Sequence, residues 1–117
     1  MTANDKVVRV RFYVSSTDKE GTLPVYESIT LAAKRMGVAG CTVYRGIMGY
    51  GASSELRSDK FWELTEKLPV VVEIVDEEEK IEPLLQAIQP RLEALPKGCL
   101  ITKERVDVLL VKQGNKK

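Results

Sequence analysis

The sequence predicts an α+β fold in which two helices cover one face of an antiparallel sheet. Three observations support this prediction: apolar and polar residues alternate over 7–14, the run 70–75 is apolar except for Glu73, and two segments carry apolar residues three or four positions apart. In chain order the elements are strand, helix, strand, strand, helix, strand, with an extra short strand near the end. That order is the split β-α-β arrangement (βαββαβ) of ferredoxin-like folds.

The first strand is expected over Val7–Val14, where every second side chain is apolar and would face the core. The first helix follows a polar stretch, with Thr22 as its expected N-cap and Pro24 in its first turn. Its apolar stripe consists of Val25, Ile29, Ala32 and Met36. Gly37 is a natural C-terminal cap, because glycine readily adopts the left-handed conformation that ends many helices.

The second strand is expected over Cys41–Met48, and Pro69 opens a third strand over Val70–Val75. Between them lies a glycine- and serine-rich stretch, 49–54, which is too flexible for regular structure. The secondary structure of residues 55–68 is left undecided, because their apolar side chains fit either a short helix or an extended arm.

The second helix has the clearest amphipathic pattern in the chain, formed by Ile81, Leu84, Leu85, Ile88, Leu92 and Leu95. Asp76 and Glu79 have the spacing of a capping box at its start. Pro90 removes one backbone donor, so we expect a kink or a split in the helix near Gln86.

Two strands, Cys99–Thr102 and Val106–Val111, are expected to complete a single domain that spans residues 1–117. Residues 113–117 would form a frayed tail.

The sheet face without helices is predicted to be too apolar for simple contact with water. It would present Val7, Arg9, Arg11, Tyr13, Val71, Glu73, Val75, Asp107, Leu109 and Val111. Such a patch usually marks an interface. We therefore expect a closed homo-oligomer packed through its sheets, with Arg9 and Arg11 paired to Glu73 and Asp107.

Composition limits the chemistry that is available. The chain of 117 residues holds no histidine, which excludes Ser-His-Asp and Cys-His nucleophile pairs, histidine-ligated zinc and histidine pH switches. The net charge is +1, so no global field attracts nucleic acid or an anionic membrane. Cys41 and Cys99 lack a CxxC partner and favour reduced thiols over a disulfide or a catalytic thiolate. Without an apolar signal-peptide core or membrane span, we expect a cytoplasmic protein.

The strongest candidate for binding chemistry is the glycine-rich stretch Gly46–Ser54, followed by Arg57. Its glycines would let backbone N–H groups converge on a phosphate, while Ser53 and Ser54 add hydroxyls and Arg57 adds a permanent charge. The alternative is a hairpin connection whose glycines only permit positive φ, since the stretch matches neither a Walker A loop nor a Rossmann fingerprint.

Other charged positions are less specific. Lys97 and Gly98, in the turn after the second helix, fit either a phosphate contact or a routine helix exit, and Lys112 fits either a ligand contact or a surface charge. The acidic run 76–79 is better explained by the positive end of a helix than by a metal. No pair of carboxylates is placed convincingly for acid–base work, so no catalytic residue and no metal ligand are expected.

Three segments are distinctive when taken together: GVAGCTVYRG from Gly37, GYGASS from Gly49 and LPVVVEIVD from Leu68. They resemble the PII-like proteins of the domain of unknown function 190 family, and the resemblance extends over roughly 7–112. That family is similar to the nitrogen-regulatory PII proteins. The resemblance implies a homotrimer with its sheets facing the three-fold axis, adenine nucleotides bound between subunits, and a long T-loop after the second strand that engages a target.

The resemblance also implies which residues line the nucleotide cleft. Gly40 and Thr42, and the glycines on either side of Tyr50, match PII positions of the cleft. Gly98 corresponds to the phosphate-binding B-loop. PII proteins carry a lysine after that glycine where this chain has a cysteine, so Lys97 would serve from the other side. The implied set is Gly40, Thr42, Gly49, Tyr50, Gly51, Ala52, Ser53, Ser54, Arg57, Lys97, Gly98 and Lys112.

Many relatives carry an arginine and a histidine in the segment that Glu55 and Arg57 occupy here. Lys112 lies near a basic PII position that reaches a neighbour's phosphates. The T-loop tyrosine that PII proteins modify has no clear counterpart.

The expected function is therefore that of a non-enzymatic, PII-like signalling protein. It would bind AMP, ADP or ATP without a metal and relay the ligand state through a T-loop-like segment at about 50–66 to a partner, such as a membrane transporter. Two alternatives remain: a structural or adaptor trimer without a small ligand, and a weak nucleotide hydrolase.

Overall fold

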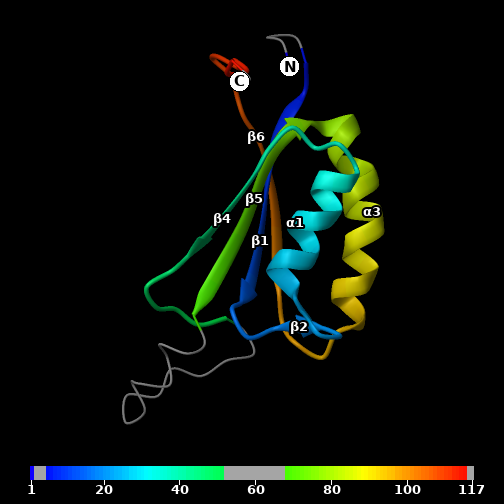
Figure 1. Ribbon diagram of the computed structural model, residues 1–117, viewed down its shortest axis with the longest axis vertical. Helices are drawn as coiled ribbons and strands as arrows, with labels where there is room; N and C mark the ends of the chain where they lie inside the picture. The colour runs from blue at the N-terminus through cyan, green and yellow to red at the C-terminus, as the bar shows by residue number, and fades with distance from the viewer. Residues whose placement is uncertain (2–4, 52–67, 116–117) are drawn as a thin grey trace.

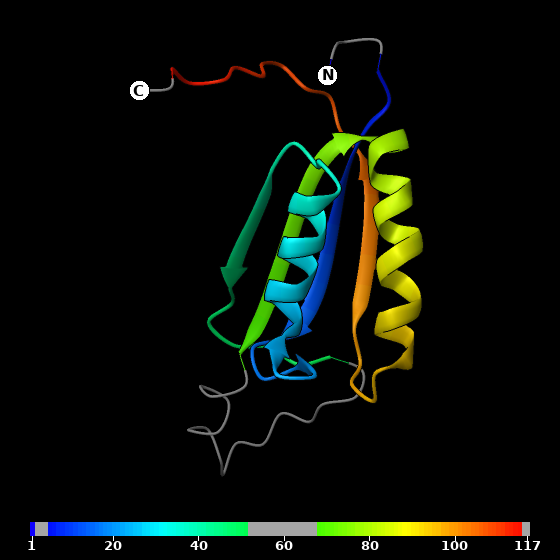
Figure 2. The ribbon, with the colours of Figure 1, turned by 45° about the vertical axis from the view of Figure 1, so that its right-hand side comes forward.

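The computed structural model describes residues 1, 5–51 and 68–115. Its elements are β1 (Val7–Ser15), β2 (Lys19–Glu20), β3 (Leu23–Pro24), α1 (Val25–Arg35), β4 (Cys41–Arg45), β5 (Pro69–Glu77), α3 (Glu78–Ala94) and β6 (Leu100–Arg105). Four strands form an antiparallel sheet in the order β4-β5-β1-β6, and β2 pairs with β3 in a small hairpin. Both helices cover one face of the large sheet (Figures 1 and 2). The predicted α+β architecture is confirmed.

The core lies between this sheet and the two helices. The alternation predicted for the first strand is confirmed, since Val8, Val10, Phe12 and Val14 are all buried. They pack against residues from both helices, including Ile29, Ala33, Ile81, Leu84 and Ile88. Burying this set supplies the main driving force for the fold.

The last strand differs from the prediction. A single strand, β6, pairs with β1 in place of Cys99–Thr102 and Val106–Val111, and residues 106–115 contain no strand. The choice follows from the cross-strand partners, because β6 sets Glu104 opposite Arg9 and Ile101 opposite Phe12. The chain then leaves the sheet after one more bond, from Val106 N to Val7 O at 3.1 Å.

The second strand, predicted to reach Met48, ends at Arg45. Its partner strand begins with Pro69, which has no N–H to donate to the ladder. The final bond is therefore made in the other direction, from Gly46 N to the Pro69 carbonyl oxygen at 2.7 Å.

Helix α1 begins later in the chain than its predicted cap implies. The residue at its N-cap position is Pro24 rather than Thr22, because the preceding residues are engaged in the β2–β3 hairpin. The predicted C-terminal cap is confirmed: Gly37 has φ +78°, and Val38 N donates to Ala33 O at 3.0 Å. This is the hydrogen-bonding pattern of a Schellman motif.

Helix α3 corrects two expectations. Asp76 belongs to β5, and the N-cap residue Glu77 makes no side-chain capping bond, so the capping box is absent. The helix also runs unbroken through Pro83 and Pro90. Both prolines are exposed, on the side away from the buried stripe that includes Leu84, so their rings do not disturb the core. No helix in the described part of the chain is long and apolar enough to cross a membrane.

Candidate functional site

The residues expected to bind a ligand lie at both ends of the sheet. Cys41 pairs with Ile74 and Arg45 pairs with Val70, so β4 starts at one end of the sheet and finishes near Pro69 at the other. Gly40 and Thr42 are therefore separated from Gly49–Gly51 by the length of β4. Gly40 and Thr42 lie at an edge of the sheet, because β4 is an edge strand, whereas Gly49 lies against Pro69 of the inner strand β5.

A buried carboxylate fixes the start of β4. Asp76 is only 1% exposed, and its Oδ2 accepts a hydrogen bond from Ala39 N at 2.8 Å. Its Oδ1 accepts a second bond, from Glu77 N at 2.7 Å. The next residue after Ala39 is Gly40, so this carboxylate sets the path of the chain into the predicted site. The signal in the sequence was the first acidic residue of the run 76–79, directly after the apolar residues Ile74 and Val75.

Thr42 is exposed on the sheet face opposite the helices, where it lies across from Glu73. Tyr44, two residues further along the same face, donates its hydroxyl hydrogen bond to Glu73 Oε2 at 3.0 Å. Polar side chains therefore continue from the candidate site along the face of β4.

Packing explains two glycines of the glycine-rich stretch. A Cβ on Gly46 would lie 2.7 Å from Pro69 Cγ, and one on Gly49 would lie 3.3 Å from the same atom. Neither glycine has a positive φ, so the conformational alternative is wrong for both. The stretch also contains exposed apolar side chains: Ile47 is 92% exposed and Tyr50 is 73% exposed.

The turn after α3 holds Lys97 and Gly98, both exposed. Leu100 follows and pairs with Tyr13, so this turn lies beside β6, at the end of the sheet where Gly49 lies against Pro69 (Figure 2). Cys99 in this turn is a free thiol, and partial burial together with the nearby carboxylates raises its pKa.

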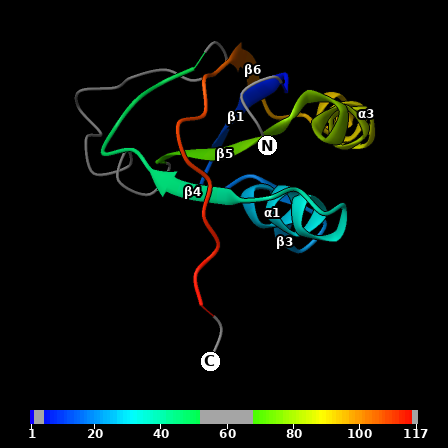
Figure 3. The same cartoon turned by 90° about the horizontal axis from the view of Figure 1, so that it is seen from above.

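Lys112 lies in the exposed segment that follows β6, beyond the end of the sheet (Figure 3). A single subunit therefore divides the candidate residues between its two edges and its two ends. Ala52, Ser53, Ser54 and Arg57 lie outside the described residues, as do positions 52–66 of the T-loop-like segment.

The sheet face opposite the helices carries a ladder of charged side chains across β5, β1 and β6. Arg9 Nε donates to Glu104 Oε1 at 2.9 Å, and Arg11 Nη1 reaches the same oxygen at 3.3 Å. Arg11 Nε also donates to Glu73 Oε2 at 3.1 Å. Although burial acts to raise the pKa of Glu73, the hydrogen bonds from Arg11 and Tyr44 outweigh it and lower that pKa.

This ladder confirms the pairing of Arg11 with Glu73 and corrects the other one. Arg9 pairs with Glu104 rather than Asp107, because β6 and not the following segment lies beside β1. Two other expected members of the exposed face, Val7 and Val71, are already buried within the subunit.

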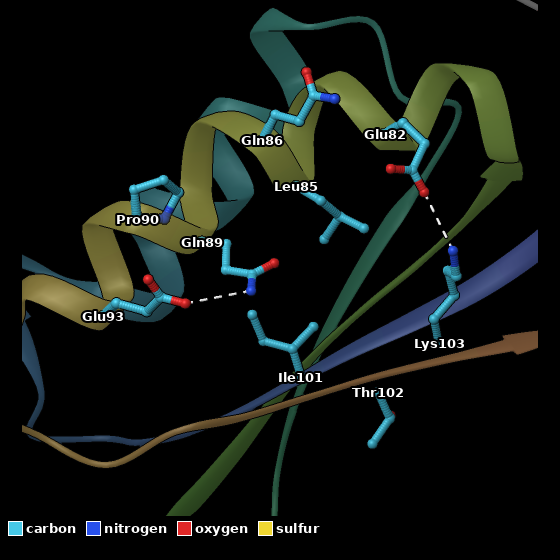
Figure 4. A pocket seen from close by; sticks show the side chains of 9 residues that line it. All are labelled: Glu82, Leu85, Gln86, Gln89, Pro90, Glu93, Ile101, Thr102 and Lys103. Atoms are coloured by element: carbon cyan, nitrogen blue, oxygen red, sulfur yellow. Dashed lines mark hydrogen bonds and ion pairs between the residues drawn. The ribbon is translucent and has the colours of Figure 1, made fainter.

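A groove of about 600 Å³ between α3 and β6 was not anticipated. Figure 4 shows the side chains that line it: Glu82, Leu85, Gln86, Gln89, Pro90, Glu93, Ile101, Thr102 and Lys103. Lys103 Nζ contacts Glu82 and Glu78, each at 3.2 Å, and these hydrogen bonds raise its pKa. Because this cation is already paired with two carboxylates, the groove is a poor match for a phosphate. None of the predicted site residues lines it.

The order of the strands and the placement of both helices on one face define the ferredoxin-like fold that PII-like proteins share. A solved structure with this fold is CPII, a nitrogen regulatory PII-like protein from Thiomonas intermedia K12, bound to ADP, AMP and bicarbonate. Its TM-score is 0.58 at 20% identity, covering 87% of this chain and 89% of CPII. The putative PII-like signaling protein TTHA0516 from Thermus thermophilus gives a TM-score of 0.58 at 21% identity, covering 89% and 90%. At these identities the likeness shows the fold alone.

The chain belongs to the DUF190 family, described as "Uncharacterized ACR, COG1993", whose sequence profile matches residues 7–108. A UPF0166 protein of Aquifex aeolicus (strain VF5) is 40% identical over 100 residues, covering 86% of this chain and 90% of the relative. UPF0166 protein MJ1524 of Methanocaldococcus jannaschii is 43% identical over 77 residues, covering 65% and 69%. The resemblance inferred from the sequence is thereby confirmed.

Proposed function

We propose that this protein is a PII-like regulatory subunit that binds an adenine nucleotide between the subunits of a homotrimer. AMP, ADP and ATP are the candidate ligands, and no metal is required. The ligand state would pass through the segment at about 50–66 to a protein partner, such as a membrane transporter, in the cytoplasm.

One observation carries the proposal: the candidate residues lie at both edges of the sheet. Gly40 and Thr42 belong to the β4 edge, whereas Lys97 and Gly98 belong to the β6 edge. Contact between the β4 edge of one subunit and the β6 edge of the next would bring the two groups to one cleft. A PII-like structure solved with ADP and AMP supports the choice of ligand class.

The residues of the described part also suit ligand binding better than catalysis. Among them no three His, Cys, Asp or Glu side chains are grouped to hold a metal ion. Arg9, Arg11, Glu73 and Glu104 already neutralise one another in the ladder. Exposed lysines and backbone N–H groups remain as contacts for phosphate.

Isothermal titration calorimetry with AMP, ADP, ATP and adenosine tests this proposal, with GTP as the control for the base. We expect saturable heat at one site per subunit for at least one adenine nucleotide, and a light-scattering mass of three subunits. Absence of heat for every adenine nucleotide at millimolar concentration would contradict it, as would a monomer at micromolar concentration. Sustained phosphate release from ATP would instead indicate a hydrolase.

The exposed apolar residues near the glycine-rich stretch favour a second function, that of an adaptor. Ile47 is 92% exposed, and Met48 and Tyr50 are also exposed, which is typical of a surface that contacts protein. A trimer that binds no nucleotide but loses partner binding when Ile47 is replaced by Glu would favour the adaptor.

A further inference from the structure

Arg45, the last residue of β4, has an exposed guanidinium group with free donors. Its side chain makes no hydrogen bond or ion pair with any residue in the described part of the chain, and the same holds for two other exposed arginines, Arg35 and Arg105. The remaining described arginines are each held by a carboxylate: Arg9, Arg11 and Arg91. Of the three free guanidinium groups, only that of Arg45 adjoins the glycine-rich stretch.

The backbone on both sides of Arg45 is fixed. Arg45 pairs with Val70 of β5, and the next residue, Gly46, donates its N–H to the Pro69 carbonyl oxygen at 2.7 Å. The side chain therefore starts from a defined point of the sheet rather than from a loop. Binding a ligand through such a group loses less conformational freedom than binding through a residue whose backbone must first be ordered.

The glycine-rich stretch returns to the same corner of the sheet. Figures 1 and 2 show the chain after β4 bending toward the start of β5. Gly46 and Gly49 both lie against the Pro69 ring, and Pro69 is the neighbour of Val70, the strand partner of Arg45. A Cβ on Gly51 would meet nothing within 4 Å, so a ligand can approach the backbone there. A cation and an accessible backbone therefore share the corner where β4 ends and β5 begins.

The turn after α3 is poorly suited to hold a phosphate by itself. Its basic residue is Lys97, but two carboxylates are close by: partial burial raises the pKa of Cys99, and the negative charges of Asp18 and Glu93 raise it further. Asp18 is only 6% exposed, so water screens its charge weakly. An anion at this turn meets both carboxylates as well as one ammonium group. A phosphate at this turn therefore requires a further cation from another part of the molecule.

We propose that Arg45 binds a phosphate group of the nucleotide, an inference that rests on the proposed function. The planar guanidinium donates two parallel hydrogen bonds to phosphate oxygens, and backbone N–H groups of the glycine-rich stretch supply further donors. Both Arg45 and the Lys97 turn lie at the Pro69 end of the sheet. The contact between the β4 edge of one subunit and the β6 edge of the next then brings Arg45 to the Lys97 turn of the neighbouring copy, where its charge offsets the carboxylates.

Calorimetry on the full chain with AMP, ADP, ATP and adenosine tests the role of Arg45. We expect Arg45→Gln to weaken binding of the tightest nucleotide about tenfold and to leave adenosine binding unchanged, because adenosine carries no phosphate. The loss should shrink at high salt, since screening weakens the contact. Arg45→Lys keeps the charge without the forked geometry, so it should recover part of the affinity. The matched control is Arg35→Gln, an exposed arginine in the last turn of α1, which should change the affinity less than about twofold.

The outcomes separate the role of Arg45 from the proposed function. If the native chain binds a nucleotide and Arg45→Gln binds it equally well, Arg45 is only a surface charge, and the proposed function stands without it. An equal loss for adenosine, or a loss that does not change with salt, also overturns the phosphate contact, because it indicates a disturbed site. A native chain that binds no adenine nucleotide overturns both. Thermal denaturation checks that each variant is folded, and Arg45→Lys serves the same comparison if Arg45→Gln is not.

Discussion

Asp76 and Ala39 join two parts of the chain that are distant in sequence, through a hydrogen bond of 2.8 Å from the Ala39 N–H to the buried carboxylate. The bond links the end of β5 to the residues that lead into β4. Because Asp76 also accepts the Glu77 N–H, the same side chain fixes the entry to α3. One carboxylate therefore positions the first candidate ligand residue, Gly40, relative to the core.

Replacing this carboxylate should weaken both stability and ligand binding. In Asp76→Asn one of the two N–H groups faces a buried NH₂ donor instead of an acceptor, which costs about 1–3 kcal/mol of unfolding free energy. Urea denaturation measures this loss, and calorimetry should show weaker nucleotide binding. The control is Glu79→Gln, the exposed position once expected to complete a capping box, with an effect within about 0.5 kcal/mol. Equal effects of the two substitutions would contradict the role given to Asp76.

The ion pair between Glu20 and Arg91 should make the free energy of unfolding fall at acid pH. Hydrogen bonds from Arg91 and then Ser28 lower the pKa of Glu20 from 4.5 to about 2. A lowered pKa in the folded state stabilises the protein above pH 4.5, and that stabilisation is lost as the pH falls toward 2. Because Arg91 is 43% exposed, solvent screening limits the contribution to about 1 kcal/mol.

Urea denaturation of Glu20→Gln across this pH range tests the contribution of the ion pair. The difference in unfolding free energy from the native chain should be full at pH 6 and shrink below pH 4.5. The exposed neighbour Lys19 provides the control, because Lys19→Gln should show a difference that does not change over that range. If the difference in unfolding free energy for Glu20→Gln did not change with pH, the ion pair with Arg91 would not be its source.

The contact between Gly46 and Pro69 predicts a steric effect. Gly46→Ala places a Cβ 2.7 Å from Pro69 Cγ, which requires β4 or β5 to shift. Overpacking of this kind costs about 1–3 kcal/mol, and thermal denaturation measures it. In Gly51→Ala the new Cβ meets nothing within 4 Å, so its melting temperature should barely change. A Gly46→Ala protein as stable as the native chain would show that the loop adjusts freely.

Lys112 should contribute charge to ligand binding although it lies beyond the last strand. We expect Lys112→Gln to weaken ATP binding about tenfold, equivalent to about 1.4 kcal/mol, and to leave adenosine binding unchanged. Calorimetry in low and high salt measures this, and the loss should be smaller at high salt because screening weakens the contact. The control is Lys80→Gln, an exposed lysine of α3 paired with Glu77. An equal loss for adenosine would point to misfolding rather than to a phosphate contact.

The sequence predicts the parts of the fold where periodicity and burial agree. Buried and less buried side chains alternate along β1, and α3 places Ile81, Leu84, Ile88 and Leu92 on one buried side. Each of these patterns fits only one kind of element in one position. The last strand has two possible placements, because both Leu100–Arg105 and Val106–Val111 have the composition of a strand. Cross-strand charge decided between them, since only the former sets Glu104 opposite Arg9. That partner is known only once the sheet is assembled.

The same limit explains the outcome at the candidate site. Gly46 and Gly49 were expected as part of a phosphate site, and the structure gives both a packing role, because each lies against Pro69, a residue distant in sequence. Asp76 matched a local capping pattern, while its true partner, Ala39, lies far upstream. Local pattern identifies which residues matter, and long-range packing determines what each of them does.

Hydrogen bonds hold the chain together on both sides of 52–67, where it leaves the sheet and where it returns. Gly46 N donates to Pro69 O at 2.7 Å, Ser16 N to Leu68 O at 2.9 Å, and Leu68 N to Ser16 Oγ at 3.1 Å. These three hydrogen bonds are all made by residues outside 52–67. Selection can therefore rewrite the sequence and length of that segment without unfolding the sheet, since longer loops add little closure entropy. A family built on this frame can vary that segment while keeping its core.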